Sequence, residues 1–358
     1  MRKEEIFSAA KIADQLIEMF ELDLEGLNLI TELASGNYLF NLLIAAKSKA
    51  NIYAIGKNSN YGQFDDITKS FEEITDTLDL NTKFINIFSE TLSEDVWRNA
   101  DIVTNSGFVR PIDKTKINLL KETAVIPLMF ESWEYRSSDL DIKECQEKGI
   151  AVIGTSENNK FINIFKYGGF MTLKLIFQLN LELVNNNIIL FGSDKIVEPI
   201  VEIFDKLDLN YKLISKELYS DLSFLLNEEN IDCIIFAEMV YCKEIFGRNS
   251  SLTFKELYSR FPYLKIGHIC GNIDVEDLKT SGIEFYPNVI QKPGYMSYQP
   301  YFLGKRPIME LYAGSLKVGE IAAKARLSGL SINESIERTV KYGIGQDFEG
   351  GFLQFDRR

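Results

Sequence analysis

Short apolar stretches alternate with segments of helical periodicity over the first 156 residues. "LNLITEL" (27–33) predicts a strand, "ASGNYLFNLLIAAKSKA" predicts a helix, and "NIYAIG" (51–56) predicts a second strand. Short connections join the three, and a strand, a helix and a strand linked in this way form a unit whose two strands pair in parallel. This alternation constrains the fold more than any other feature, because it predicts an α/β protein built on parallel sheets.

A second alternating set begins with "NNIILFG" (186–192) and continues through the apolar strands "DCIIFA" and "LKIGHI". The segment 158–183 between the two sets is largely apolar and predicts one long helix. From Arg306 to about Lys341 the pattern is helical again, with a capped helix beginning near Ser331. We therefore predict two Rossmann-like parallel-sheet domains joined by a long helix, with C-terminal helices that pack back on the first domain.

The predicted division has three parts: an α/β domain of the substrate-binding type (1–157), a nucleotide-binding type of domain (158–305), and the returning C-terminal helices (306–358). A chain of 358 residues is longer than most single cores, which stop growing at roughly 250–300 residues. Two domains therefore agree with its length.

Acidic residues outnumber basic ones, 52 to 39, and the net charge is −13. A nucleic-acid partner is not expected, because binding phosphate backbones needs clustered Lys and Arg. No apolar run approaches the ~18 residues of a membrane span, and the N-terminal segment predicts an amphipathic helix instead of a signal peptide. We expect a cytoplasmic protein with no membrane partner and with reduced cysteines, although two disulfides are the alternative. The four cysteines are irregularly spaced and the chain has one histidine, so no metal site is predicted.

The turn after the strand 186–192 is where a dinucleotide-binding chain carries G-x-G-x-x-G, which brings its backbone close to the pyrophosphate. This chain has "GSDKIV", with Gly192 and Ser193 followed by Asp194 and Val197 at the second and third glycine positions. Asp194 would bring a carboxylate toward the pyrophosphate. We predict Gly192, Ser193 and Asp194 as cofactor contacts, but a turn that has lost its phosphate cradle is an equally open alternative.

Ser215 and Lys216 follow the next strand, at the position that usually supplies an acid for the ribose hydroxyls. This pair suits a 2′-phosphate better than a bare ribose. If a dinucleotide binds, the sequence therefore predicts NADP in preference to NAD.

Polar residues stand at several predicted strand ends, which is where ligands of open α/β sheets bind. His268, the only histidine, is predicted as a general acid or base near neutral pH, and the alternative is a packed loop histidine. Arg110 could hold a substrate carboxylate through two hydrogen bonds, or be solvated. Glu131 is the third catalytic candidate, with a salt bridge to Arg136 as the competing explanation.

Five further residues are predicted to contact substrate. Four follow strands of the first domain, and the fifth belongs to an aromatic loop (294–307) for which packing or a dimer contact is the alternative to a ligand lid. They are Asn37, Asn105, Ser106, Arg136 and Tyr298.

Three segments resemble known enzymes. "GHICGNIDV" (267–275) is similar to the G-H-F-x-x-E-I-D-V segment of S-adenosylhomocysteine hydrolases, and "NKFINIFKYGG" (159–169) is similar to their K-S-K-F-D-N-x-Y-G helix. "KECQEKGIAVIGT" (143–155) resembles the strand that leads to the interdomain crossing of D-isomer-specific 2-hydroxyacid dehydrogenases. The resemblance is to the superfamily that unites both families. It implies two Rossmann-like domains, a nicotinamide cofactor beside 267–275 with Asn272 at an acidic position of the motif, and a homodimer.

This chain also departs from both families at their catalytic positions. The hydrolases' lysine and aspartate fall on Asn158 and Ile162, and the dehydrogenases' arginine falls on Cys270. The proton relay of the dehydrogenases needs a later histidine, which this sequence does not contain. Neither parent activity therefore carries over residue by residue.

Three functions follow from these patterns. The first is an NAD(P)-dependent oxidoreductase-like enzyme that acts on a small polar metabolite in an interdomain cleft. The second is a cofactor-free descendant of the fold that binds a small molecule or a partner, or has a non-redox activity. The third is an S-adenosyl or nucleoside ligand bound without hydride transfer. It is based on residues 32–56, which are arranged like the first motif of methyltransferases but have only one glycine before the helix.

Overall fold

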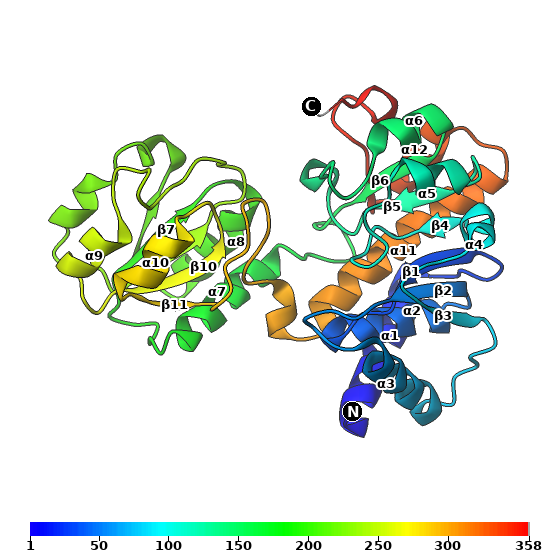
Figure 1. Ribbon diagram of the computed structural model, residues 1–358, viewed down its shortest axis with the longest axis horizontal. Coiled ribbons are helices and arrows are strands. Elements are labelled where there is room, and N and C mark those ends of the chain that lie inside the picture. The colour runs from blue at the N-terminus through cyan, green and yellow to red at the C-terminus, as the bar shows by residue number, and fades with distance from the viewer. Residues whose placement is uncertain (357–358) are drawn as a thin grey trace. The chain divides into compact units, whose positions relative to one another are not determined.

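The computed structural model describes residues 1–356, apart from the side chain of Asp194. The chain forms two compact units, one from residues 1–164 together with 304–358 and the other from residues 165–303 (Figure 1). We predicted divisions after residues 157 and 305.

Unit 1 is built on a seven-stranded sheet in the order β12-β6-β5-β4-β1-β2-β3. All pairs are parallel except β12 with β6. The strands are β1 (Asn28–Glu32), β2 (Asn51–Gly56), β3 (Ile85–Ser89), β4 (Ile102–Val103), β5 (Val125–Pro127), β6 (Ala151–Thr155) and β12 (Gly345–Gln346).

Eight α-helices surround this sheet in the described part of unit 1. They are α1 (Lys3–Phe20), α2 (Leu39–Lys47), α3 (Phe64–Thr77), α4 (Glu94–Asn99), α5 (Lys114–Leu119), α6 (Ile142–Lys148), α11 (Arg306–Leu327) and α12 (Ile332–Tyr342). The connections include 3₁₀ turns η1 (Gly36–Tyr38), η2 (Ser132–Glu134) and η6 (Phe352–Gln354).

The C-terminal helices belong to unit 1, as the sequence predicted. Helix α11 packs against β5, β6, α1 and α2, and it is buried along most of its length (Figure 1). Gly319 permits this approach, because a Cβ there would lie 2.9 Å from Ile102 Cγ2 and 3.1 Å from Pro127 Cγ. Helix α12 begins with the expected capping box, in which Ser331 and Glu334 bond each other's backbone.

Unit 2 carries a five-stranded parallel sheet in the order β11-β10-β9-β7-β8. Its strands are β7 (Ile188–Gly192), β8 (Tyr211–Ile214), β9 (Cys233–Ala237), β10 (Lys265–Cys270) and β11 (Glu284–Tyr286). Its helices are α7 (Lys166–Gln178), α8 (Asp194–Lys206), α9 (Phe254–Arg260) and α10 (Val275–Ser281), with 3₁₀ turns η3 (Lys216–Leu218), η4 (Ser223–Asn227) and η5 (Pro300–Leu303).

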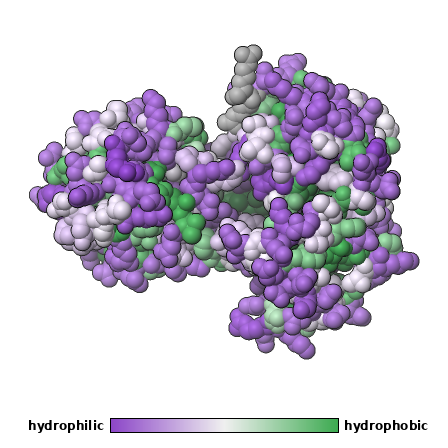
Figure 2. All heavy atoms as spheres, in the orientation of Figure 1, coloured by the Kyte–Doolittle hydropathy of each residue, from purple (hydrophilic) through white to green (hydrophobic). Residues whose placement is uncertain are grey.

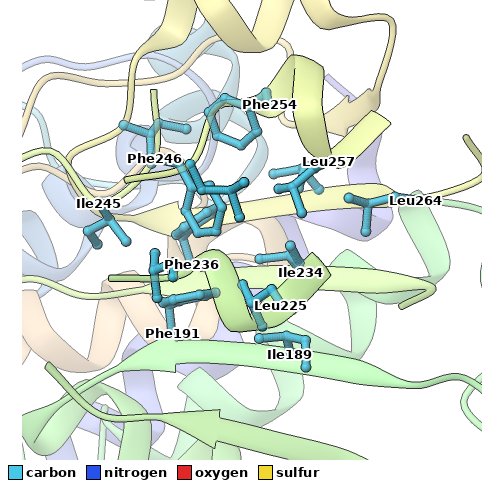
Figure 3. Packing of buried hydrophobic residues seen from close by; sticks show 14 of the residues in the cluster. Ile189, Phe191, Leu225, Ile234, Phe236, Ile245, Phe246, Phe254, Leu257 and Leu264 are labelled. Atoms are coloured by element: carbon cyan, nitrogen blue, oxygen red, sulfur yellow. The ribbon is translucent and has the colours of Figure 1, made fainter. Parts of the chain in front are cut away.

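Aromatic packing fills one face of the unit 2 sheet. Phe191 of β7 stacks on Phe236 of β9 with ring centroids 5.2 Å apart, and Phe246 meets both rings edge-on (Figure 3). Phe254 of α9 stacks on Phe246 at 5.4 Å. All four side chains are fully buried, which agrees with parallel strands covered on both faces.

The predicted long helix over 158–183 is wrong in length, because α7 covers only Lys166–Gln178. The Asn159 side chain accepts hydrogen bonds from the amides of Phe161 and Ile162, so the chain turns there instead of entering a helix. Gly169 lies inside α7. A Cβ at Gly169 would lie 2.5 Å from the Pro199 carbonyl oxygen, so this glycine lets α7 and α8 pack closely.

The α/β class with two Rossmann-like parallel sheets is confirmed. Figure 2 shows hydrophilic residues over most of the visible face of each unit, with apolar residues in smaller patches. Across residues 1–356, no helix has both the length and the apolar composition that crossing a bilayer requires.

Candidate functional sites at two strand-order reversals

Each sheet has one point at which the strand order reverses, and open α/β sheets bind ligands outside the carboxyl ends of the strands at such points. In unit 1 the reversal lies between β1 and β4, because β2 and β3 extend the sheet to one side and β4 to β6 to the other. In unit 2 it lies between β7 and β9. The carboxyl ends of the strands at these two reversals, the β1–β4 crevice and the β7–β9 crevice, are therefore the candidate sites.

The unit 2 turn keeps Gly192 at the end of β7. A Cβ on Gly192 would lie 2.7 Å from the Ala237 carbonyl oxygen and 3.0 Å from Val197 Cγ2, so only glycine fits between the strand and helix α8. Ser193 is the N-cap residue of α8, and Asp194 is its first helical residue, with a side chain outside the described part of the structure.

A glutamate missing from our predicted contacts occupies this crevice. Glu238 follows β9, is 1% exposed, and accepts hydrogen bonds from the Ser193 hydroxyl at 2.8 and 3.0 Å. The Tyr219 hydroxyl donates to its Oε2 at 3.1 Å, and the amides of Val240 and Tyr241 donate to its Oε1 at 3.0 Å each. A carboxylate therefore lies against the middle residue of the turn where a pyrophosphate would have to approach.

Two tyrosine rings close the same crevice. Tyr219 comes from the segment after β8 and Tyr241 from the segment after β9, and their rings meet edge-on with centroids 5.0 Å apart. Burial first, and then the Glu238 carboxylate, raise the pKa of Tyr219, so its hydroxyl stays a donor. Tyr219 and Tyr241 thus pack beside Glu238, within unit 2 itself.

Ser215 and Lys216 are exposed after β8, where the sequence placed a ribose contact. The Ser215 hydroxyl hydrogen-bonds to Glu217, which lowers the pKa of that carboxyl. An acid therefore stands one residue beyond the predicted pair, and it carries the wrong charge for a 2′-phosphate.

His268 lies in β10 and is completely buried. Its Nδ1 lies 2.9 Å from Ser297 Oγ, and its Nε2 lies 3.2 Å from the Gly271 carbonyl oxygen. Because a carbonyl can only accept, Nε2 carries the proton and Nδ1 accepts from Ser297, whose oxygen accepts in turn from the Gln291 amide at 2.8 Å. Burial lowers the pKa of His268 to about 4, so the ring is neutral at pH 7 with both nitrogens engaged.

The other predicted contacts of unit 2 have structural surroundings. Asn272 donates its side-chain amide to the Cys242 carbonyl at 2.7 Å. Tyr298 is fully buried and stacks on Phe302 with centroids 4.4 Å apart, and its hydroxyl has no hydrogen-bond partner among the described residues. Neither residue lies on the strands that flank the reversal.

Unit 1 also places a glutamate at its reversal point. Glu32 is the last residue of β1 and is 9% exposed. Its Oε2 accepts from the Phe108 amide at 3.0 Å, and the Gly107 amide also bonds to this carboxyl. Burial raises the pKa of Glu32, against the opposing effects of those amides and of Arg110.

Asn105 and Ser106 follow β4, beside Glu32. The Asn105 side-chain oxygen accepts from the Met129 amide at 2.7 Å, but its Nδ2 is buried without a hydrogen-bond partner in residues 1–356. Ser106 Oγ lies 2.8 Å from Thr104 Oγ1, which bonds Thr31 Oγ1 at 3.1 Å. A chain of buried hydroxyls thus links the ends of β1 and β4, and it continues to Tyr312 of α11, 2.8 Å from Thr31.

The two predicted arginines of unit 1 share one acid. Arg110 Nη1 lies 2.7 Å from Asp139 Oδ2, and Arg136 Nη1 lies 3.4 Å from the same oxygen. Arg136 also stands over the Phe130 ring at 5.3 Å. Both guanidinium groups therefore have partners within unit 1, and Arg110 still influences Glu32 electrostatically.

Glu131 is buried after β5 and ties the ends of two strands together. It accepts from Trp133 Nε1 at 2.6 Å and from the Glu157 amide, beyond β6, at 3.2 Å. Asn37 lies half-buried in η1, before α2.

The structure thus brings Asn105, Ser106 and Glu32 together at the unit 1 reversal, with Arg110 close enough to act on the glutamate. Glu32 is a residue that the sequence analysis missed. Its signal was an acid inside the apolar stretch 27–33, which predicted a buried strand. Within residues 1–356, no group of three or more His, Cys, Asp or Glu side chains is placed to hold a metal ion.

A separate cavity of about 390 Å³ lies elsewhere in unit 1. Asp113 and Asp141 line it and cap α5 and α6, and Tyr135 and Lys143 also line it. It contains none of the predicted site residues.

The fold is similar to that of a dipicolinate synthase chain from Bacillus subtilis. The TM-score is 0.51 at 11% sequence identity, and the match covers 85% of this chain and 99% of that one. The likeness is one of fold. A dipicolinate synthase chain from Bacillus halodurans matches with a TM-score of 0.49 at 10% identity, over 81% and 96% of the two chains.

An NAD-complexed D-isomer-specific 2-hydroxyacid dehydrogenase from Lactobacillus delbrueckii ssp. bulgaricus matches with a TM-score of 0.45 at 11% identity, over 83% and 97%. No protein-family model matches the chain, and neither does any curated protein sequence. The fold implied by the sequence resemblance is confirmed by the Bacillus subtilis match and by the two sheets.

Proposed function

We propose that this chain binds a small polar metabolite without a nicotinamide cofactor and has a non-redox role. The observation that carries the proposal is the buried Glu238 carboxylate, which accepts from Ser193 in the middle of the turn that a dinucleotide would need. The second of the functions predicted from the sequence, a cofactor-free descendant of the fold, is therefore favoured.

Electrostatic magnitudes support this choice. Two like charges about 4 Å apart repel by roughly 4 kcal/mol at an effective dielectric constant of 20. The N-terminus of a helix such as α8 attracts an anion by only about 0.3–2 kcal/mol. A pyrophosphate placed beside Ser193 would therefore lose more from Glu238 than it gains from the helix.

Other contacts at this reversal point the same way. Tyr219 donates to Glu238, and its ring packs edge-on against Tyr241. His268 would have to break its bond to Gly271 or Ser297 before it could exchange a proton with a substrate. Its geometry supports a role in fixing the loop at Ser297 onto β10.

An NAD(P)-dependent oxidoreductase is the second candidate, and the fold favours it, because dinucleotides bind Rossmann sheets at the strand-order reversal. For that candidate, Lys216 favours NADP, the form predicted from the sequence. Glu217, which is hydrogen-bonded to Ser215, favours NAD instead. A cytoplasmic location, a homodimer and the absence of a nucleic-acid partner stay predictions.

One experiment separates the two candidates. The protein is purified without added ligand, denatured and examined for released small molecules by mass spectrometry, and NADH and NADPH are then titrated by fluorescence. We expect no released dinucleotide and no saturable binding. Binding of either form with a Kd below about 100 µM, a standard free energy near −5.5 kcal/mol, overturns the proposal.

Glu238→Gln is the matched variant. If the carboxylate is what excludes the pyrophosphate, removing its charge raises dinucleotide affinity above that of the wild type. Weaker binding in the variant would mean that Glu238 is a cofactor ligand.

A further inference from the structure

We propose that the carboxyl ends of β1 and β4, at the strand-order reversal of unit 1, form a site for a small carbonyl compound. Asn105 Nδ2 donates to the carbonyl oxygen, and Glu32 moves the proton of the adjacent carbon. The inference rests on the proposed function only in expecting a small polar ligand and non-redox chemistry.

Glu32 has the placement of an acid–base group. It ends β1 at the reversal of the sheet and is 91% buried, since 9% of its surface is exposed. Two loop amides, those of Gly107 and Phe108, bond to its carboxyl, and the nearby cation, Arg110, is paired with Asp139 at 2.7 Å instead. Burial raises the pKa of Glu32 above its ordinary value, which makes its carboxylate a stronger base than an exposed one.

Asn105 supplies a second, independent observation. It is 1% exposed, and its oxygen is fixed by the Met129 amide, so the orientation of the side-chain amide is set. The Nδ2 group therefore remains a buried donor without an acceptor in the described part of the chain. A buried donor without an acceptor is unfavourable, and a ligand oxygen would satisfy it.

Glu32 ends β1, and Asn105 lies in the segment that follows the neighbouring strand β4. β1 and β4 pair in parallel with Ile30 opposite Val103, and the next pair, Thr31 and Thr104, touches through its hydroxyls at 3.1 Å. Glu32 and Asn105 are the next residues along the chain after these two threonines, and Asn105 lies two residues beyond the end of β4. The acid and the amide therefore both lie at the carboxyl end of the sheet, beyond the same pair of hydroxyls.

Four groups around the carboxyl influence its charge or respond to it. Arg110 favours the ionised form, whereas Tyr312 lies behind it at the end of the hydroxyl chain and is itself affected by Glu32, which together with burial raises the pKa of the phenol. The amides of Gly107 and Phe108 favour the ionised form as well. Burial therefore acts on the Glu32 carboxyl in the opposite direction to these contacts.

The chemistry balances without a cofactor. The carboxylate of Glu32 takes a proton from the carbon beside the ligand carbonyl. The electrons of that C–H bond form a C=C bond, and those of the C=O π bond move to the oxygen that accepts from Asn105 Nδ2. Return of the proton to the same carbon restores the carbonyl compound, so the reaction class is enolisation with exchange of the protons on that carbon.

The test measures exchange of carbon-bound protons with solvent. Pyruvate, acetone and dihydroxyacetone are each supplied at millimolar concentration in D₂O, and proton NMR follows the loss of the C–H signals. We expect the wild type to exchange at least one probe about 10²-fold faster than Glu32→Gln, the lower range for general-base catalysis. Asn105→Ala should lose about tenfold.

Glu94→Gln is the matched control, since it makes the same substitution at an exposed α4 position and should exchange at the wild-type rate. Thermal unfolding followed by circular dichroism verifies that each variant is folded. Equal exchange by the wild type and Glu32→Gln, or no exchange by the wild type above buffer, overturns the inference. The dinucleotide titration is separate, so a failure there leaves the result for Glu32 interpretable.

Discussion

The two strand-order reversals each contain a buried glutamate, but the two carboxylates have different surroundings. Glu238 in unit 2 accepts from two hydroxyls and two amides, and tyrosine rings pack beside it. Glu32 in unit 1 accepts from amides of the loop after β4, and Asn105, whose Nδ2 is unpartnered among the described residues, lies in the segment that follows this neighbouring strand. A carboxylate at a strand end is therefore structural when its own unit satisfies it, and a candidate for chemistry when donors beside it remain unused.

The largest expected effect is a difference in stability between the two glutamine variants. Glu238→Gln turns an amide nitrogen toward a site lined by donors, which leaves about two of them without an acceptor and lowers the free energy of unfolding by about 4 kcal/mol. Glu32→Gln should cost about 1 kcal/mol or less, because a neutral amide suits a site that already disfavours the ionised form. Urea unfolding of both variants measures the difference, and equal losses would show that the two carboxylates are equivalent.

His268 in unit 2 and Glu32 in unit 1 should make stability depend on pH in opposite directions. The folded pKa of His268, about 4, lies below its ordinary 6.5, so the unfolded chain binds the proton first as the pH falls. The His268 contribution is complete above pH 6.5 and is lost between pH 6.5 and 4, by about 3 kcal/mol in all. Glu32 acts in the opposite direction, because its raised pKa makes the folded state the better proton binder, so stability falls as the pH rises through that pKa.

NMR of the ring protons checks the histidine directly, since a chain with one histidine gives one imidazole titration. His268→Asn should remove about 2 kcal/mol of the difference in unfolding free energy between pH 7 and pH 5. An imidazole that titrates near 6.5 would mean that the ring is accessible to water, and it would restore His268 as a catalytic candidate.

The periodicity of the sequence was sufficient for the sheets but not for every helix. Apolar stretches of four to six residues became β1, β2, β7, β9 and β10, because parallel strands buried on both faces need such runs. The segment 158–165 had a helical apolar pattern as well, but the side chain of Asn159 bonds its own backbone and turns the chain. A hydrogen bond from one side chain to the backbone is invisible to a periodicity argument.

The candidate sites show a similar limit. The degenerate turn at Gly192 and Ser193 was visible in the sequence, but the partner that fills it, Glu238, is 45 residues away from Ser193. The position of His268 was also visible, whereas the burial that lowers its pKa depends on Phe236 and Ser297 from other segments. Long-range contacts decide whether a polar strand end is satisfied or available.

Glycine substitutions should sharpen the contrast in rigidity between the two crevices. In Gly192→Ala the new Cβ meets the Ala237 carbonyl at 2.7 Å, and backbone cannot move aside cheaply, so we expect a loss of about 2 kcal/mol in unfolding free energy. In Gly107→Ala the Cβ meets Glu32 Oε2 at 2.9 Å, the end of a side chain that can rotate, and the loss should be below about 1 kcal/mol. Urea midpoints with unchanged m-values test both, and a larger loss for Gly107→Ala would show that the Glu32 loop is as rigid as the turn at Gly192.

The smallest effects come from single hydroxyls. Ser193→Ala removes a donor to Glu238, which keeps its bonds from Tyr219 and two amides, so the expected loss is about 1 kcal/mol. Ser106→Ala removes the outer hydroxyl of the chain in unit 1, next to Asn105, and should cost about the same. The informative measurement is carbon-bound proton exchange in the two variants, because Ser106→Ala can alter it and Ser193→Ala cannot if the reacting site lies in unit 1. Exchange that falls in Ser193→Ala but not in Ser106→Ala would move the site to the β7–β9 crevice and reverse the comparison between the two glutamates.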